Sequence, residues 1–98
     1  MTLGGTQKKY LRGLAHHLQP VVQLGKEGLS DGIVKATDEA LNTHELIKVR
    51  LPQVDRHERK ALAASLEEQT GSDLAGITGR IAILYRRHPD EPKIRLPR

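Results

Sequence analysis

Apolar residues recur at helical spacing in three segments of the 98-residue chain. The segments span residues 7–17, 31–43 and 56–69, and each gathers apolar side chains on one face and charged ones on the remaining surface. A side chain able to cap the first helical turn precedes each segment: Thr6, Ser30 and Asp55. The pattern predicts three amphipathic helices, with Gly71 as a natural stop for the third.

Four shorter segments have the pattern of β-strands: residues 21–24, 45–51, 73–77 and 80–86. The first is a brief apolar run, which predicts a strand buried on both faces. In the second, apolar side chains alternate with Lys48 and Arg50, so these two basic residues are expected on the opposite face. Thr78 and Gly79 separate the last two segments and predict a hairpin turn.

The predicted elements follow one another in the order α-β-α-β-α-β-β. Helices between strands suggest right-handed crossovers with parallel pairing, and the final hairpin adds an antiparallel pair. The sequence therefore predicts one domain over residues 1–98, a small mixed α/β sandwich. We expect a flexible lead-in over residues 1–5 and an extended basic tail over 87–98, which Ile94 and Leu96 could pin to the body.

The composition narrows the class of protein. Hydrophobic residues make up 37% of the chain, Phe and Trp are absent and Tyr occurs twice, so we expect an aliphatic core. No apolar run approaches the roughly 20 residues of a membrane span, and the N-terminus lacks an apolar signal core. Cys is absent, which fits a reducing compartment. We therefore expect a cytoplasmic protein without a membrane partner.

The formal net charge of +4 predicts attraction to polyanions. The alternative is a soluble protein that is merely basic. Scarce aromatic residues argue against stacking of nucleic-acid bases on a sheet, which needs exposed rings. Any nucleic-acid binding should therefore depend on the backbone and shape of the nucleic acid.

One stretch favours an anion-binding loop: Gly25, Lys26, Glu27 and Gly28 form a G-x-x-G pattern between a predicted strand and a predicted helix. Two glycines allow a sharp turn and leave no side chain in the way of a ligand. Ser30 would cap a helix whose free N–H groups favour a phosphate. Glu27 works against a simple cation trap, and a plain strand-to-helix turn is the alternative interpretation.

Basic residues on other elements could extend this site. They are Lys8, Lys9 and Arg12 on the first helix, Lys48 and Arg50 on the second strand, and Arg80 at the last hairpin. The third helix carries acids at Glu58, Glu67 and Glu68, so we expect charge to be segregated between elements. This favours a one-sided basic face, with ordinary charged surface as the alternative.

No pattern in the sequence points to catalysis. The five histidines lack metal-ligand spacing, the serines lack a G-x-S-x-G context, and the glycine loop matches neither a P-loop nor a dinucleotide fingerprint. We therefore expect no enzyme activity, no cofactor and no metal site. A second G-x-x-G, at residues 76–79, leads into a strand and is interpreted as a hairpin turn.

Several runs, in order and covering nearly the whole chain, carry a resemblance to a known family. They are TQKKYLRGLAH at 6–16, PVVQLGKEGL at 20–29, HELIKV at 44–49, GR at 79–80, LYR at 84–86 and KIRLPR at 93–98. Together they resemble bacterial YhbY-type proteins, the stand-alone form of the CRM (chloroplast RNA splicing and ribosome maturation) domain.

This resemblance implies an RNA-binding domain with a mixed four-stranded sheet, similar to the C-terminal domain of translation initiation factor three. The G-x-x-G loop of the family falls on residues 25–28, and bacterial members are associated with precursors of the large ribosomal subunit. The expected function is non-catalytic binding of ribosomal RNA by a monomer that assists large-subunit maturation. The alternative is a protein-interaction module that docks an acidic ribosomal or assembly protein.

Overall fold

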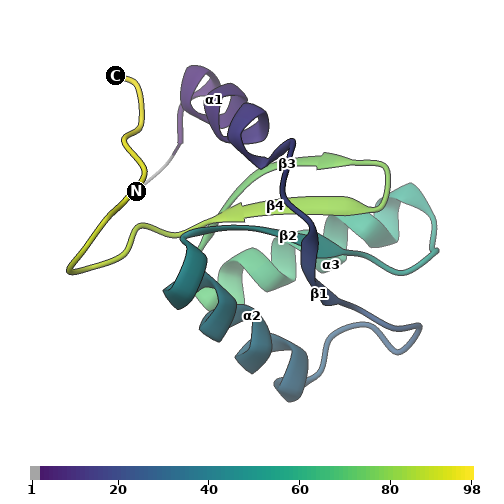
Figure 1. Ribbon diagram of the computed structural model, residues 1–98. Coiled ribbons are helices and arrows are strands. Elements are labelled where there is room, and N and C mark those ends of the chain that lie inside the picture. Colours follow the sequence, from purple (N-terminus) through teal and green to yellow (C-terminus); the bar gives the residue numbers. More distant parts are fainter. Residues whose placement is uncertain (1–2) are drawn as a thin grey trace.

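The computed structural model describes residues 3–98 of the chain, and Figure 1 shows the arrangement of its helices and strands. The elements are α1 (Gly5–Ala15), β1 (Pro20–Gln23), α2 (Asp31–His44), β2 (Leu46–Arg50), α3 (Arg56–Thr70), β3 (Asp73–Thr78) and β4 (Ile81–Tyr85). Their order is the one that the sequence predicts. No helix of the described part is long and apolar enough to cross a membrane.

The four strands form one mixed sheet in the order β1-β2-β4-β3. β1 pairs with β2 in parallel, and β4 pairs antiparallel with both β2 and β3. The predicted fold class is confirmed, including the parallel pair joined through α2 and the final hairpin. The prediction that β1 is buried on both faces is wrong, because β1 is an edge strand and Val21 is 51% exposed.

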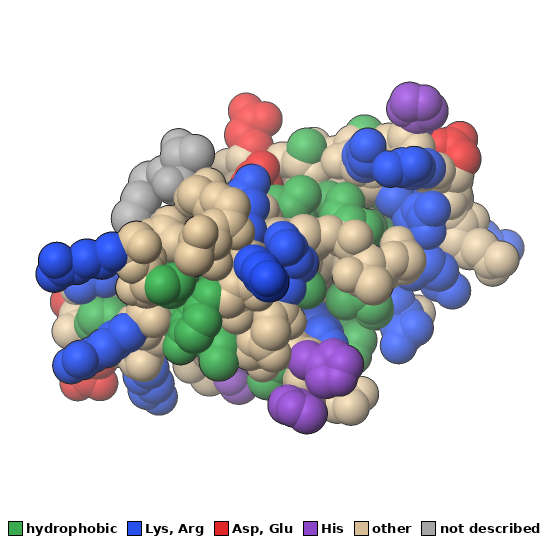
Figure 2. All heavy atoms as spheres, turned by 90° about the horizontal axis from the view of Figure 1, so that it is seen from above, with side chains coloured by type: hydrophobic (Ala, Val, Ile, Leu, Met, Phe, Trp, Pro, Cys, Tyr) green, Lys and Arg blue, Asp and Glu red, His purple; other side chains and the backbone are tan. Residues whose placement is uncertain are grey.

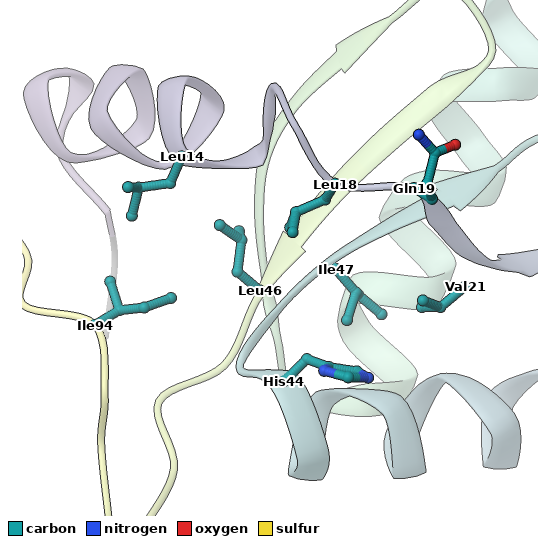
Figure 3. Close-up of a pocket in the computed structure, with 8 residues that line it drawn as sticks. All are labelled: Leu14, Leu18, Gln19, Val21, His44, Leu46, Ile47 and Ile94. Atoms are coloured by element: carbon teal, nitrogen blue, oxygen red, sulfur yellow. The ribbon is translucent and has the colours of Figure 1, made fainter.

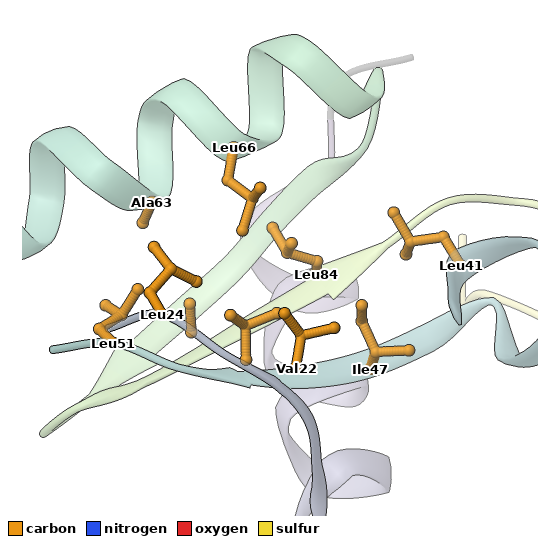
Figure 4. Packing of buried hydrophobic residues seen from close by; sticks show 10 residues of the cluster. Val22, Leu24, Leu41, Ile47, Leu51, Ala63, Leu66 and Leu84 are labelled. Atoms are coloured by element: carbon orange, nitrogen blue, oxygen red, sulfur yellow. The ribbon is translucent and has the colours of Figure 1, made fainter. Parts of the chain in front are cut away.

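Helices cover both faces of the sheet. On one face, α2 and α3 bury the larger cluster of aliphatic side chains, to which β1, β2 and β4 also contribute. Figure 4 shows Ala63 and Leu66 of α3 directed at this layer, with Leu41 of α2 beside it. On the other face, α1 packs against β2, β3 and β4 through Leu11 and Ala15. The core is aliphatic as expected, apart from the buried Tyr85.

The start of α1 differs from the prediction. Leu3 is buried in the cluster under α1, and Gly4 is the N-cap residue, whose N–H donates to Gln7 Oε1 at 3.1 Å. The prediction of a flexible lead-in is therefore wrong for residues 3–5, because Leu3 anchors this segment to the core. Residues 1–2 lie outside the described part. Thr6 lies inside the helix and does not cap it. The helix also ends at Ala15, two residues before the predicted end.

The caps predicted for the other two helices are confirmed. Ser30 Oγ accepts the N–H of Ile33 at 3.2 Å, and Asp55 Oδ1 accepts the N–H of Glu58 at 2.9 Å. Gly71 ends α3 with a φ of 64°, a left-handed conformation that glycine adopts without strain. These local interactions set where α2 and α3 begin and where α3 turns into β3.

The C-terminal tail is held against the body by Glu45, a buried carboxylate between α2 and β2. Glu45 Oε1 accepts the N–H groups of Lys93 and Ile94 at 2.6 and 3.1 Å, and Oε2 accepts that of His88 at 2.9 Å. Burial raises the pKa of Glu45, but these bonds and the charge of His88 outweigh it and leave the pKa below its ordinary value. Ile94 and Leu96 pack against the α1 side of the core, so their predicted pinning role is confirmed.

Candidate nucleic-acid interface

The G-x-x-G loop joins the edge strand β1 to α2 and forms a closed turn. The N–H of Leu24 donates to the carbonyl of Arg50 at 2.9 Å, and the N–H of Gly28 donates to the carbonyl of Gly25 at 3.0 Å. Lys26 and Glu27 therefore occupy the tip of the turn, where both are exposed. Figure 1 shows the loop projecting from the body beyond the end of β1.

The two glycines of the loop have different constraints. Gly28 has a φ of 79°, and a Cβ there would lie 3.3 Å from Leu62 Cδ2 on α3, so turn and packing both require glycine. Gly25 is exposed, a Cβ there would meet nothing within 4 Å, and its φ lies outside the left-handed region. The fold therefore does not need a glycine at position 25, where the backbone is bare and open to a ligand.

The start of α2 adds backbone donors next to the loop. Of the N–H groups in its first turn, that of Ile33 is taken by Ser30, which leaves those of Asp31 and Gly32 without a partner inside the helix. The partial positive charge of this helix end favours an anion, but the exposed carboxylate of Asp31 competes for the same position.

Arg50 and Lys48 lie on one face of β2, as predicted. Arg50 is exposed and pairs in register with Gln23, two residues before the loop. Lys48 Nζ donates to the carbonyl of His16 at 3.3 Å, and Arg12 Nη1 donates to the carbonyl of Ala75 at 2.9 Å. The backbone of Arg50 therefore lies beside the start of the loop, and its side chain lines a hollow along β1. Lys48 and Arg12 are partly engaged in holding α1 on the sheet.

The remaining predicted cations lie elsewhere. Lys8 and Lys9 are in the first turns of α1, which Figure 1 shows at the opposite end of the molecule from the loop. Arg80 is half-buried at the β3–β4 turn, and its Nε donates to the carbonyl of Leu51 at 3.1 Å. The ten predicted site residues are thus spread over the molecule and do not form one compact site.

Three cations of α3 do not appear among the predicted site residues. Arg56, Arg59 and Lys60, in the first turns of α3, line a cleft of about 260 Å³ together with Ile77 and Gly79. The expectation that charge is segregated by element is wrong, because α3 is basic at its start and carries Glu67 and Glu68 in its second half. The run RHERK at 56–60 is the signal that could have indicated this cluster.

The charge of the surface is uneven. Figure 2 shows the face that carries α1, over which Lys and Arg side chains are spread widely. They gather at the right-hand end, which is the side of the β3–β4 turn in Figure 1. Acidic side chains lie at the margins of this view. The described residues hold one ion pair, in which Arg86 Nη1 lies 2.6 Å from Asp38 Oδ1. Most basic side chains of the described part therefore have no acidic partner in the chain.

A second kind of surface lies between α1, the start of β1 and the end of α2. A hollow of about 430 Å³ there is lined mainly by aliphatic side chains, with His44 and Gln19 at its polar positions and without Lys or Arg. Figure 3 shows Leu14, Leu18 and Val21 entering it from successive parts of the chain. These three and Tyr10 are the large hydrophobic residues that are exposed in the described part.

A single α/β domain with an exposed glycine loop among cations belongs to the class of proteins suited to bind polyanions at their surface. The chain belongs to the CRS1/YhbY (CRM) domain family, whose model matches residues 3–86. This confirms the resemblance noted in the sequence.

Relatives and a solved structure are similar along almost the whole chain. An "RNA-binding protein" of Haemophilus influenzae is 43% identical over 99% of this chain and 97% of its own length. The "Probable RNA-binding protein YqeI" of Bacillus subtilis is 38% identical over 97% of this chain and 99% of its own. A solution structure of a Staphylococcus aureus protein, 40% identical, superimposes with a TM-score of 0.88 over 98% of this chain and 100% of that one.

Proposed function

We propose that this chain is a non-catalytic, monomeric, cytoplasmic RNA-binding protein that contacts the RNA backbone through the G-x-x-G loop. The observation that carries the proposal is the bare backbone at Gly25, beside the exposed Lys26, at a position where the fold itself needs no glycine. A missing side chain that packing does not require leaves room for the close approach of a ligand. The names of the relatives support RNA as that ligand.

The chemistry at this loop suits a phosphodiester. Lys26 supplies a mobile positive charge, Arg50 a second one at the end of β2, and the start of α2 supplies backbone N–H groups. Contacts of this kind position an RNA strand without reading its sequence. Specificity would then come from the shape of the RNA or from the particle that presents it.

We extend the proposal to the maturation of the large ribosomal subunit. Its support is family membership together with the association of bacterial YhbY-type proteins with large-subunit precursors. The natural test is co-sedimentation of the tagged protein with ribosomal particles at low and moderate salt. If about four phosphates are contacted, a fourfold rise in salt should weaken binding by roughly 50-fold. Sedimentation only as free protein at both salt concentrations would contradict this role.

The loop itself is tested by the double variant Gly25→Asp with Lys26→Glu. Both positions are exposed and a side chain at position 25 meets open space, so the fold should be retained. We expect loss of RNA binding with an unchanged melting temperature. Gly28→Asp is unsuitable for this purpose, because the left-handed φ and the contact with Leu62 would disturb the loop. Undiminished affinity in the folded double variant would contradict the loop as the contact site.

The apolar hollow favours a second candidate function, the docking of a ribosomal or assembly protein. The supporting observation is that Leu14, Leu18 and Val21, all exposed, line one hollow that contains no cation and therefore does not suit a phosphate. Lys9 and Tyr10 lie in an adjoining hollow, so an apolar segment with acidic residues would fit best. Association that survives ribonuclease treatment would support this function, and complete loss of association would exclude it.

A further inference from the structure

The cleft at the start of α3 is a strongly basic hollow of the described surface. Three of its five lining residues are Arg56, Arg59 and Lys60, and the other two are Ile77 and Gly79. Arg59 Nη1 donates to the carbonyl of Gly79 at 3.0 Å, which holds this guanidinium across the cleft. Most of its other N–H groups have no hydrogen-bond acceptor among the described residues. Arg56 and Lys60 are exposed.

Acidic residues near the cleft do not neutralise these cations. Asp55 is used as the N-cap, where Oδ1 accepts the N–H of Glu58. Glu58 lies two residues from both Arg56 and Lys60 on the helix, a spacing at which side chains do not face each other. Within the described residues, no salt bridge involves any of the three cations. The cleft therefore presents three positive charges that no acidic side chain of the described residues pairs with.

The G-x-x-G loop contacts α3 within one helical turn of Arg59, one of the residues that line the cleft. Leu62 is the side chain against which Gly28 packs, and it follows Arg59 by three residues, a spacing that puts two side chains on the same helix face. The loop therefore lies against α3 at one helical turn from the cleft. From Arg59 the cleft extends to Gly79 at the β3–β4 turn.

We propose that Arg56, Arg59 and Lys60 form a second phosphate-binding site for the same RNA strand that contacts the loop. The strand would run from Lys26 past Arg59 to the β3–β4 turn, and not across the face of α1. On that other path Arg12 and Lys48 both donate to carbonyl groups, those of Ala75 and His16, whereas in the cleft only Arg59 makes such a bond. This inference rests on the proposed function, because it assigns the path of the RNA bound there.

The test compares two double charge reversals of equal net charge. Arg56→Glu with Lys60→Glu removes the two cations of the cleft that have no structural bond, and leaves Arg59 in place. Lys93→Glu with Arg95→Glu changes two exposed cations of the tail and serves as the matched control. A glutamate at position 56 lies in the first turn of α3, where an acid favours the helix, so folding should be retained.

The measurement is the affinity for a mixed-sequence single-stranded RNA of about 20 nucleotides, long enough to span more than one contact, as a function of salt. We expect the cleft variant to bind about tenfold more weakly than the control at low salt. The slope of log K against log salt should become less negative by about 1.4, because two phosphate contacts on a single strand are lost. Melting temperatures of both variants are measured alongside.

The outcomes separate the inference from the proposed function. If the cleft variant behaves like the control while Gly25→Asp with Lys26→Glu loses binding, the second site is overturned and the loop stands. If the cleft variant loses binding and the loop variant does not, the cleft is a phosphate site but the proposed loop contact fails. If the wild-type chain shows no salt-dependent binding of this RNA, both are overturned.

Discussion

Gly25 and Gly28 close the same turn, but the fold requires a glycine only at position 28. At Gly28, the positive φ and the nearby Leu62 oppose any side chain. At Gly25 neither constraint exists, so a glycine there has no structural explanation in the described part of the chain. The sequence pattern alone cannot make this distinction, because it depends on the backbone angles and on a neighbour from α3.

Single alanine substitutions test this distinction. Gly28→Ala should lower the free energy of unfolding by about 1–2 kcal/mol, the usual cost of a left-handed residue that is not glycine. Gly25→Ala should be neutral or stabilising by up to about 1 kcal/mol, because it restricts only the unfolded chain. Urea denaturation of both variants measures the two effects. Equal destabilisation would contradict the different roles assigned here.

Glu45 links the tail to the body through a charge, and stability should therefore depend on pH. Its pKa is lowered in the folded state, so its contribution is fully present above the ordinary value of 4.5 and is lost as the pH falls through the lower folded value. Glu45→Gln keeps the shape but weakens the three N–H bonds, and should cost about 1–3 kcal/mol near neutral pH.

The measurement for Glu45 is the melting temperature of wild type and variant across the acid range. We expect the difference between the two proteins to shrink as the pH falls below 4.5 and the wild-type carboxylate becomes protonated. A difference that does not change with pH would show that charge at Glu45 contributes nothing.

At the scale of elements, the sequence predicted two of the three helix caps and the parallel β1–β2 pair, but it misplaced the cap of α1 and the position of β1 in the sheet. Ser30 and Asp55 were identified as caps because a cap bonds to the turn that follows it, within three residues. The burial of β1 was mispredicted, because a strand's position at the sheet edge depends on the order of all four strands. The basic start of α3 was missed, because its relation to the loop arises only when Leu62 packs against Gly28.

Arg86 shows how one side chain joins elements that the sequence does not connect. Its guanidinium donates to Asp38 Oδ1 and to the carbonyl of Thr70, both at 2.6 Å, and to Asn42 Oδ1 at 2.8 Å. It therefore links the end of β4 to α2 and α3. From the sequence it appears as one of several basic residues near the C-terminus.

Replacing this arginine by lysine should destabilise the protein although the charge is kept. A lysine is a single-point donor and cannot reproduce the planar set of bonds to two helices, so Arg86→Lys should cost about 1–3 kcal/mol. The exposed neighbour Arg87 provides the matched control, and Arg87→Lys should change stability by less than about 0.5 kcal/mol. Chemical denaturation of the two variants gives the comparison, and equal midpoints would exclude the linking role.

At the scale of the whole molecule, β1 connects two surfaces of opposite character. Its first residues border the apolar hollow beside Leu14, and its last residue leads through Leu24 into the exposed, charged G-x-x-G loop. Because the strand is at the sheet edge, neither surface is covered by another strand. This separation means that binding of RNA and docking of a protein would use different residues and could occur at the same time.

The two surfaces should therefore be separable by mutation. Leu14→Ser with Val21→Ser changes two side chains that are 41% and 51% exposed, so the core should be little affected. We expect this variant to retain salt-sensitive RNA binding but to lose any association with ribosomal particles that resists ribonuclease. Gly25→Asp with Lys26→Glu should show the reverse pattern. If the apolar variant loses RNA binding with an unchanged melting temperature, the RNA site extends to the hollow, because an effect on folding would have lowered that temperature as well.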